Sequence, residues 1–498
     1  MAMFQVVGAR RRQLRRVVVV LGSAAAIAAA CASGAAERAA TPVSAGFGPA
    51  IDVSDGAAAY ARHCAACHGA SGDADTVAAR ALFPAPRAFR DGVFKLASTG
   101  NGVPTEDDLV RTLRRGLPGS SMPGYDWLPD RTLRALALHV IALGGEHAAA
   151  PGAPVRVPPE PPRDYATLAA GEQLFRRHCA DCHGADGTGR QPDPSWAGAR
   201  DMVWARDFTA GFLRGSVSFH DLVCRVRAGM PGARMPATEL DDRQTAQLVA
   251  FVQSLIPDGA EQHHVQWRRR LRAARLPALP ATATDPAWDA IEAVRLPTAP
   301  LWWRADAVHE VWLRAAHDGA RLAVQLQWDD DSRDDRATGR SVLADGAALE
   351  LTAADDPPAF AMGGGEAVDL WHWQAFRRDD LAGGLDLLDA AVHQDLDATV
   401  ELPGVTAPQR RGEAIRVRGP DDAARRRGQG IALRVDPTWR DGRWTVVFAR
   451  DLAPRADDEI GLAPGAEVKL ALAVWDGAID PNPGSKSVTT WHVLELER

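Results

Sequence analysis

Two short segments of this 498-residue chain could attach a metal-containing cofactor covalently. One begins at Cys64 and the other at Cys179, and each reads Cys-x-x-Cys-His. The two thiols of such a unit form thioethers with the vinyl groups of haem, and the adjacent histidine ligates the iron from the proximal side. The two alternatives are a zinc site and a thioredoxin-like redox pair. A zinc site would need four protein ligands at matched spacings. The sequence therefore predicts two covalent c-type haems, attached through Cys64, Cys67, Cys179 and Cys182, with His68 and His183 as proximal ligands.

Two methionines are candidates for the distal ligands of these haems. Met122 and Met235 each stand in a Met-Pro turn, 54 and 52 residues after the respective proximal histidine. The segments around them align without a gap, and in that alignment Met230 matches Leu117. The alternative is that these methionines fill gaps in the core. That role fits Met230 better than it fits Met122 and Met235. We therefore expect Met122 and Met235 to bind the iron.

The flanks of the two motifs repeat as well. Gly56 and Tyr60 precede the first motif at the spacing with which Gly171 and Phe175 precede the second. This spacing puts the glycine, the aromatic ring and the cysteine on one helical face. The repeated order of helix, haem motif, Met-Pro loop and helix resembles class I cytochrome c domains, whose first and last helices cross at a small-residue contact. The resemblance implies two all-α domains.

After Pro257 the pattern changes from helices to strands. Twelve of the 15 tryptophans lie in the last half of the chain, and residues 322–328 and 468–474 alternate between apolar and other side chains. Such alternation is typical of half-buried strands. Asp318-Gly319 and Asp441-Gly442 are strong signals for hairpin turns. This region is therefore predicted to be one antiparallel β-sandwich.

Lysine is rare in this chain, since only Lys95, Lys469 and Lys486 occur among 57 basic residues. A desolvated lysine can lose its proton and offer a lone pair to a metal, whereas arginine stays protonated. Lys486 lies in a predicted loop, where a chance surface lysine is the alternative. Met362 is the only methionine after Met235 and stands before three glycines.

Three segments of the last region resemble the haem-binding domain of ethylbenzene dehydrogenase γ subunits, namely 285–329, 362–373 and 474–488. Related γ subunits belong to chlorate and selenate reductases and dimethylsulfide dehydrogenase. In that family one b-type haem is held noncovalently between a methionine and a lysine. The resemblance implies Met362 and Lys486 as these two ligands.

The walls of this third site can also be predicted. We expect an apolar pocket around Lys486, lined by neighbours such as Trp371 or Trp373. The chief rival ligand is His372, which strand alternation places on the opposite face from the two tryptophans.

The chain is thus predicted to be multidomain, with two all-α cytochrome c domains followed by an all-β antiparallel sandwich. The predicted boundaries are 1–31 for an export signal, 52–147 for the first cytochrome domain, 148–164 for a proline-rich linker, 165–257 for the second cytochrome domain, 258–280 for a linker and 281–498 for the haem b-binding sandwich.

The first residues have the pattern of an export signal. Five arginines precede a 14-residue apolar run that ends at Ala30, which is too short to cross a bilayer. Cys31 is either lipidated after cleavage, which would anchor the chain to a membrane, or removed with the leader. No later stretch is long and apolar enough to span a membrane, so we expect the mature body to be soluble. The leader itself predicts a periplasmic or otherwise exported protein. Cys224 follows no haem motif and is interpreted as a small helical residue.

These predictions point to an electron-transfer protein with two haem c groups and one haem b. The resemblance implies an iron–sulfur subunit of a molybdoenzyme, or another redox carrier, as its partner. The formal net charge of −7 argues against a nucleic-acid binder, and no residue resembles a substrate catalyst. Two alternatives stay open: a dihaem cytochrome whose sandwich binds carbohydrate or another ligand without haem, and a dihaem peroxidase, which would need a distal site that can open.

Overall fold

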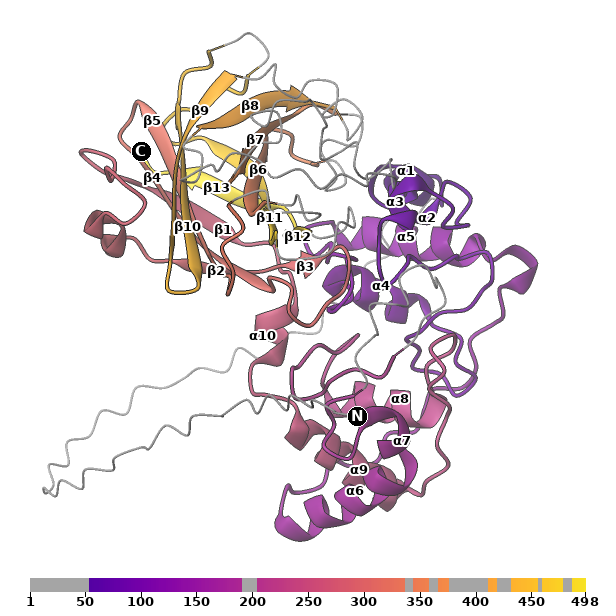
Figure 1. Ribbon diagram of the computed structural model, residues 1–498. Helices are drawn as coiled ribbons and strands as arrows, with labels where there is room; N and C mark the ends of the chain where they lie inside the picture. Colours follow the sequence, from indigo (N-terminus) through magenta and orange to yellow (C-terminus); the bar gives the residue numbers. More distant parts are fainter. Residues whose placement is uncertain are drawn as a thin grey trace, which may run out of the picture. The chain divides into compact units, whose positions relative to one another are not determined.

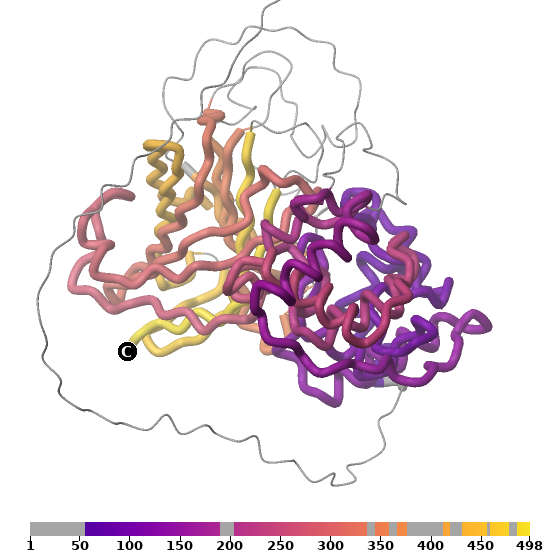
Figure 2. Tube along the Cα trace, turned by 90° about the horizontal axis from the view of Figure 1, so that it is seen from below, coloured from indigo at the N-terminus to yellow at the C-terminus, as the bar shows by residue number. Residues whose placement is uncertain are grey.

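The computed structural model describes residues 53–189, 204–335, 344–357, 366–375, 411–418, 431–455, 459–477 and 486–498. The described elements are helical up to His264 and are mainly strands after it (Figure 1). The Cα trace shows the same division, from the coiled indigo-to-magenta part to the extended orange-to-yellow part (Figure 2). The predicted order of all-α domains before an all-β region is therefore confirmed. The predicted export signal and Cys31 lie outside the described residues.

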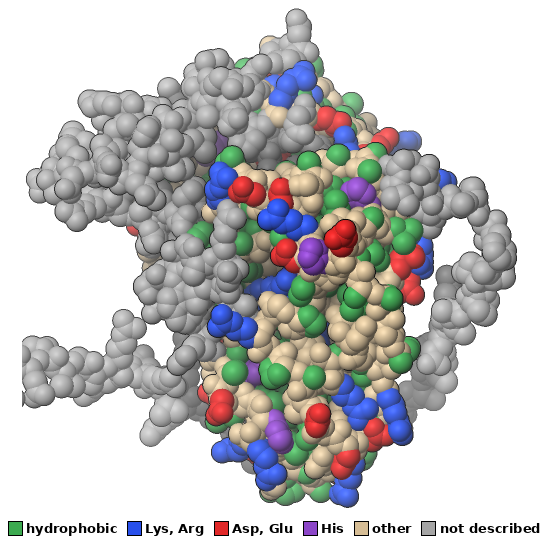
Figure 3. All heavy atoms as spheres, turned by 90° about the vertical axis from the view of Figure 1, so that its right-hand side faces the viewer, with side chains coloured by type: hydrophobic (Ala, Val, Ile, Leu, Met, Phe, Trp, Pro, Cys, Tyr) green, Lys and Arg blue, Asp and Glu red, His purple; other side chains and the backbone are tan. Residues whose placement is uncertain are grey.

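Two surface properties accompany this architecture. None of the described helices is both long enough and apolar enough to cross a bilayer. On the face presented in Figure 3, acidic and basic side chains are interspersed among apolar ones, without a continuous basic stripe along its described residues.

The helices of the first domain are α1 (Val53–His63), α2 (Ala65–His68), α3 (Val77–Arg80), α4 (Glu106–Arg115), α5 (Asp130–Ala142) and the short 3₁₀ helix η1 (Gly145–His147). Helices α1 and α5 cross at Gly56, where an added Cβ would lie 2.1 Å from the carbonyl oxygen of Ala135. Tyr60, one turn further along α1, is buried with Leu133 and Leu136 of α5. The crossing therefore needs glycine because the two backbones touch.

The second domain repeats this arrangement with α6 (Tyr165–His178), α7 (Ala180–His183), α8 (Phe219–Ala228), α9 (Asp242–Leu255) and α10 (Ala260–His264). An added Cβ on Gly171 in α6 would lie 2.1 Å from the carbonyl oxygen of Gln247 in α9. The small-residue crossing of first and last helices is thus confirmed in both domains. Cys224 is buried in α8, as expected for a small helical residue.

The proline-rich segment between these domains is extended and packed. The Gly100 amide donates to the Ala153 carbonyl at 2.9 Å, and the Val155 amide donates to the Ser98 carbonyl at 2.8 Å. Val155 and Val157 then pack against the core of the second domain. Residues 153–157 of this segment therefore contact both domains.

The strands are β1 (Arg270–Arg275), β2 (Val294–Pro297), β3 (Ala299–Pro300), β4 (Glu310–His317), β5 (Arg321–Asp329), β6 (Gly346–Thr352), β7 (Val368–Gln374), β8 (Arg411–Val417), β9 (Ile431–Arg440), β10 (Arg443–Asp451), β11 (Glu467–Trp475), β12 (Lys486–Val488) and β13 (His492–Leu496), with the 3₁₀ helix η3 (Pro286–Ala290) before β2. Their order is β13-β1-β4-β5-β10-β9-β8-β7-β6-β11-β12-β3, with β2 beside β4. Since β13 also pairs with β11, the sheet folds back on itself and encloses one core.

Strand β1 lies in the segment predicted to be a linker. It pairs in parallel with β13 and with β4, whereas the other described pairings of the sheet are antiparallel. Its alternation is short, with Leu271 and Ala273 buried between exposed arginines, and its partner β13 is the last strand of the chain. The sheet therefore begins at Arg270, earlier than the sequence pattern indicates.

Both predicted hairpins are present. Asp318 and Gly319 separate the paired strands β4 and β5, and Asp441 and Gly442 separate β9 and β10. Asp441 and Gly442 have φ angles of 53° and 76°, the left-handed conformation that a two-residue hairpin turn requires.

Candidate haem sites

The first Cys-x-x-Cys-His motif occupies the junction of α1 and α2. Cys64 ends the first helix, and its carbonyl accepts the His68 amide at 2.9 Å, so the motif folds into one tight turn. Burial raises the pKa of Cys64 to about 12 and that of Cys67 to about 11. Both thiols are thus uncharged in the apolar wall of one pocket. They suit the uncharged thioethers of a c-type haem.

The proximal histidine is held in the state that iron requires. Nδ1 of His68 lies 2.9 Å from the carbonyl oxygen of Arg87, so Nδ1 donates its proton and Nε2 keeps a free lone pair. Burial lowers the pKa of His68, which keeps the ring neutral. The ring stacks on Phe89 at 4.4 Å between centroids. These contacts fix both the tautomer and the orientation of the ring.

Met122 lines the same pocket as His68 and both cysteines. Its loop is closed by the Leu117 amide, which donates to the Met122 carbonyl at 3.1 Å. The pocket thus combines two thiols, a neutral imidazole and a thioether within apolar walls, the donor set of a covalent His/Met haem. The apolar side chains in these walls include Leu82, Phe89, Phe94, Leu109, Leu113 and Val140.

The second motif has the same local structure. The His183 amide donates to the Cys179 carbonyl at 2.9 Å, and the His183 ring stacks on Phe208 at 4.6 Å. Burial raises the pKa of Cys179 to about 11 and lowers that of His183. Residues 190–203, which follow this motif, lie outside the described residues.

The loop around Met235 repeats the loop around Met122. The Met230 amide donates to the Met235 carbonyl at 2.9 Å, which is the contact made by Leu117 in the first domain. Gly229, like its counterpart Gly116, has a φ of 69°. An added Cβ there would lie 2.7 Å from the Met235 carbonyl oxygen. The ungapped alignment of Met235 with Met122 therefore holds in three dimensions, and Met230 occupies the position of Leu117.

The sequence also contains a second repeat that we did not predict to be functional. The segment from Arg87 to Lys95 and the segment from Arg206 to Arg214 share the pattern Arg-x-Phe-x-x-Gly-x-x-Lys/Arg without a gap. Its phenylalanines stack on the two proximal histidines, and the first arginine carbonyl holds His68. A separate comparison of the segments between each haem motif and its Met-Pro loop would have found it.

Lys486 begins β12 beside the last residue of β11. It pairs with Trp475, and Nζ lies 5.8 Å from the centre of that indole ring. Burial lowers the pKa of Lys486, and the charge of Glu350 opposes the shift. A desolvated amine of this kind can act as a metal ligand. Met362, the other predicted ligand, lies outside the described residues.

The walls predicted for the Lys486 site are wrong. Trp371 and Trp373 face the enclosed core, where Trp373 packs against Trp444. Paired residues of neighbouring strands share one face of a sheet, and the pairs Lys486–Trp475, Trp475–Gly346 and Gly346–Gln374 place Lys486 on the other face.

His372 shares that outer face, because it stands two residues from Gln374. Its ring lies 5.6 Å from the Trp475 ring. The alternation expected for His372 was right, but it places this rival ligand on the same face as Lys486, and both side chains lie near the Trp475 ring. A buried apolar cluster covers the same face, which suits a noncovalent haem. Its members include Ala348, Val368, Leu370, Val417, Ala471, Trp475 and Trp491.

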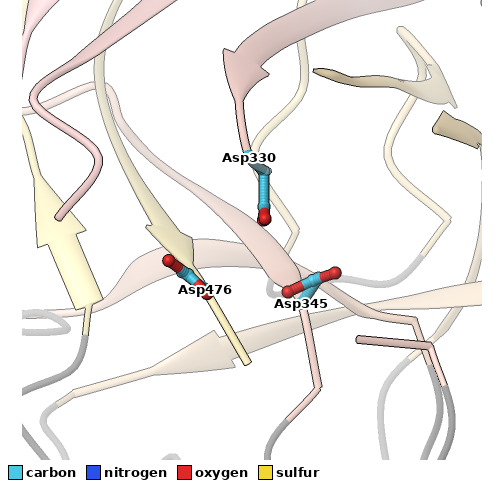
Figure 4. A group of neighbouring side chains, drawn as sticks. All are labelled: Asp330, Asp345 and Asp476. Atoms are coloured by element: carbon cyan, nitrogen blue, oxygen red, sulfur yellow. The ribbon is translucent and has the colours of Figure 1, made fainter. Parts of the chain in front are cut away.

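Three carboxylates form a separate cluster at strand ends of the sheet. Asp330 follows β5, Asp345 precedes β6 and Asp476 follows β11, and their side chains converge (Figure 4). Ligand atoms of all three lie within 4.8 Å of one another. Asp345 accepts hydrogen bonds from Trp444 Nε1 at 2.9 Å and from the Gly477 amide at 2.8 Å.

Protonation can balance the charge of this cluster. Burial and the neighbouring carboxylates raise the pKa of Asp330 to about 8, and burial raises that of Asp345 to about 6. Without a bound cation, these shifts favour a proton on Asp330. Closely spaced carboxylate oxygens are ligands that Ca²⁺ takes, with backbone carbonyls and waters completing its shell, so this cluster can hold either a proton or a cation.

Three family models match separate parts of the chain. Residues 52–140 match the model described as cytochrome C oxidase, cbb3-type, subunit III, and residues 168–255 match the model described as cytochrome c. Residues 404–487 match the model described as ethylbenzene dehydrogenase.

Two curated relatives are similar to parts of the chain. The putative respiratory nitrate reductase heme subunit ORF7 of Haloferax mediterranei is 26% identical over 222 residues, which cover 43% of this chain and 67% of the relative. Dimethylsulfide dehydrogenase subunit gamma of Rhodovulum sulfidophilum is 28% identical over 185 residues, which cover 36% of this chain and 56% of the relative. The match thus spans little more than half of the second relative.

A solved structure shows a partial likeness. A chain of the reducing HAO-like protein complex of Kuenenia stuttgartiensis is 29% identical, with a TM-score of 0.37, over 41% of this chain and 96% of that chain. By the matched family models, the chain contains two cytochrome c domains, which bear covalent haem c, followed by an ethylbenzene dehydrogenase domain of the haem b type.

Proposed function

We propose that this chain is an exported three-haem electron-transfer subunit, which passes electrons between a molybdenum/iron–sulfur oxidoreductase and a second redox carrier. The observation that supports it best is the pocket of the first domain, where His68 and Met122 lie together with both cysteines. A haem with both axial positions filled has no position for substrate, so it exchanges single electrons. The proposal therefore assigns no catalytic residue to this chain.

Each haem has its own ligands in this proposal. Cys64 and Cys67 hold the first c haem, and Cys179 and Cys182 hold the second. The b haem lies on the outer face of the sandwich. The axial pairs are His68 with Met122, His183 with Met235, and Met362 with Lys486.

A set of ion pairs supports a direct route from the b haem to the first c haem. Arg62, two residues before Cys64, pairs with Asp356 and with Glu366, each at 2.6 Å. His63 Nε2 also lies 3.2 Å from Asp356. Asp356 and Glu366 stand on either side of residues 358–365, the segment that includes Met362. The helix that leads into the first haem motif is therefore attached to both ends of that segment.

The partner and the location follow from the relatives and the domains. The two curated relatives are named as a heme subunit of a nitrate reductase and as the gamma subunit of a dehydrogenase. We assign a corresponding place to this chain, next to an iron–sulfur subunit of a molybdoenzyme. Covalent haem attachment goes with export, and lipidation of Cys31 would add a membrane anchor.

The proposal is tested by electron exchange within the full chain. The purified protein is reduced and then mixed with an excess of an oxidised small cytochrome c, and the b and c haems are followed separately by their α bands. We expect the b haem to be oxidised through the c haems, on one common time course. A b haem that stays reduced while the c haems are oxidised would contradict the route. Rapid turnover of hydrogen peroxide would favour a peroxidase instead.

A further inference from the structure

Four cations meet where the two cytochrome domains touch. Arg87 and Lys95 come from the first domain, and Arg206 and Arg214 hold the matching positions of the second. Each of the four is half-buried. The charge of Lys95 interacts with those of Arg214, Arg87 and Arg206, so the four lie within electrostatic reach of one another.

A reciprocal pair of hydrogen bonds joins the domains at this point. Arg87 donates to the Gly232 carbonyl of the second domain at 3.2 Å, and Arg206 donates to the Gly119 carbonyl of the first at 2.6 Å. Gly119 and Gly232 are equivalent positions in the two Met-Pro loops. A Cβ on either glycine would lie 2.7 Å from the guanidinium that it receives. The two domains thus contact each other through matching groups, each reaching the methionine loop of the other.

Among the described residues, carboxylates compensate this concentration of positive charge only weakly, through the charge of Asp91 acting on Arg87. Within the described ranges none of the four cations forms an ion pair with a carboxylate. Nε of Arg214 and Nη1 of Arg206 are buried without any hydrogen-bond partner. Burial and mutual repulsion lower the pKa of Lys95 to about 6 and that of Arg214 to about 10. Buried charges of one sign are costly unless an anion is bound among them.

The anion can be identified from the pocket that these side chains line. Arg87, Lys95 and Arg214 belong to the wall of the pocket that also contains Cys64, His68 and Met122. Haem has two anionic groups, its propionates, and guanidinium groups bind carboxylates through two parallel hydrogen bonds. The cations therefore lie where the cofactor of this pocket supplies negative charge.

We propose that Arg87, Lys95 and Arg214 form the propionate site of the first c haem, so that the second cytochrome domain supplies a residue that contacts the cofactor of the first. The inference rests on haem attachment to the first domain and goes beyond the proposed electron route. Arg206 acts as a positioning residue, because it holds the Gly119 carbonyl in the loop of Met122. Arg214 would then connect the charge of the first haem to the second cytochrome domain.

The test compares Arg214→Gln with Arg90→Gln in the full chain. Arg90 lies on the same segment as Arg87, but it is exposed and absent from the pocket wall. Both c-haem potentials are measured by spectroelectrochemistry, and the first haem is identified as the one that Met122→Ala perturbs. Removing a buried cation favours ferric haem, so Arg214→Gln should lower the potential of the first haem. We expect a shift of about 59 mV, which corresponds to a ten-fold change in the equilibrium constant for one electron. The propionate bending mode in resonance Raman spectra should shift with it, and Arg90→Gln should change neither.

A second pair of variants tests the propionate site if the Arg214→Gln protein does not fold well enough to be purified. Lys95→Arg introduces the residue found at the equivalent position of the second domain and should keep the potential and the propionate mode. Lys95→Gln should change both. The proposal is overturned if the potential and the mode are unchanged in Gln variants that contain both covalent haems. That outcome would not change the number of b haems bound or the oxidation of the b haem through the c haems. It can therefore be told apart from a failure of the proposed electron route.

Discussion

The first cytochrome domain and the outer face of the sandwich show two ways of building a haem site. In the cytochrome domain, both cysteines and the proximal histidine lie within one turn, and Met122 comes from one short loop. On the sandwich, Lys486 depends on the pairing of β12, β11, β6 and β7 for its surroundings. The first kind of site can be derived from spacing along the chain. The second requires knowledge of which strands are neighbours and which faces they share.

The largest effect is expected for Lys486→Arg in the full chain. Arginine keeps the positive charge but supplies no lone pair, so the noncovalent haem should be lost while both covalent haems are retained. Extraction of b haem and its pyridine haemochrome spectrum measure this loss. Lys469→Arg is the matched control, since Lys469 lies in neighbouring β11 and interacts with Asp355 at 3.8 Å.

His372 provides the outcome that would contradict this assignment. His372 shares the outer face with Lys486, so His372→Ala must be compared in the same preparation. Retention of b haem in Lys486→Arg together with its loss in His372→Ala would make histidine the ligand.

The next effect concerns the methionine loops. Met122→Ala and Met235→Ala should each remove about a third of the far-red sulfur-to-iron absorbance, because each variant affects one of the three methionine-ligated haems of the proposal. Met230→Ala should leave that band unchanged, since Met230 contributes the loop hydrogen bond through its backbone amide. Loss of the band in Met230→Ala alone would show that the repeat alignment is wrong.

A smaller effect is expected from the helix crossing of the second domain. Gly171→Ala puts a Cβ 2.1 Å from the Gln247 carbonyl oxygen, and relief of that contact should cost about 1–3 kcal/mol. Gly100→Ala is the control, because its Cβ would lie 3.7 Å from the nearest atom, the Ala153 carbonyl oxygen. Thermal unfolding followed by circular dichroism in the Soret region compares the two. Equal stability of both variants would mean that the two backbones separate without cost.

The smallest effect is a pH dependence in the sandwich. The pKa of Asp330 is raised to about 8 from the ordinary value of 3.8. The folded protein therefore binds this proton more tightly than the unfolded chain, and the contribution of Asp330 to stability falls as pH rises from about 4 to 8.

Asp330→Asn removes that dependence. It should raise the melting temperature at pH 8 by roughly 2–4 °C and have less effect near pH 5. Calorimetry of both proteins, with EDTA present and again with added Ca²⁺, makes the comparison. Stabilisation of the wild type by Ca²⁺ would show that the cluster binds a cation instead of sharing a proton.

Local chemistry explains how much could be predicted from the sequence. The haem motifs, the Met-Pro loops and the turn at Asp441-Gly442 were predicted because each depends on a few neighbouring residues. Strand β1 was missed because its partner β13 is remote in sequence. The walls around Lys486 were misassigned because alternation gives the two faces of one strand but not which of them Lys486 joins. Arg87 and Lys95 belong to a repeat that can be found in the sequence. Only the pocket that they line indicates which group they bind.

The central claim is that two cytochrome c domains and a haem b domain act together in one chain. The most direct measurement is the haem stoichiometry of the purified full chain, by pyridine haemochrome before and after extraction with acidified acetone. The account predicts two haems that stay bound covalently and one b-type haem that is extracted. Two covalent haems with no extractable haem would contradict it and would favour a dihaem cytochrome with a haem-free sandwich.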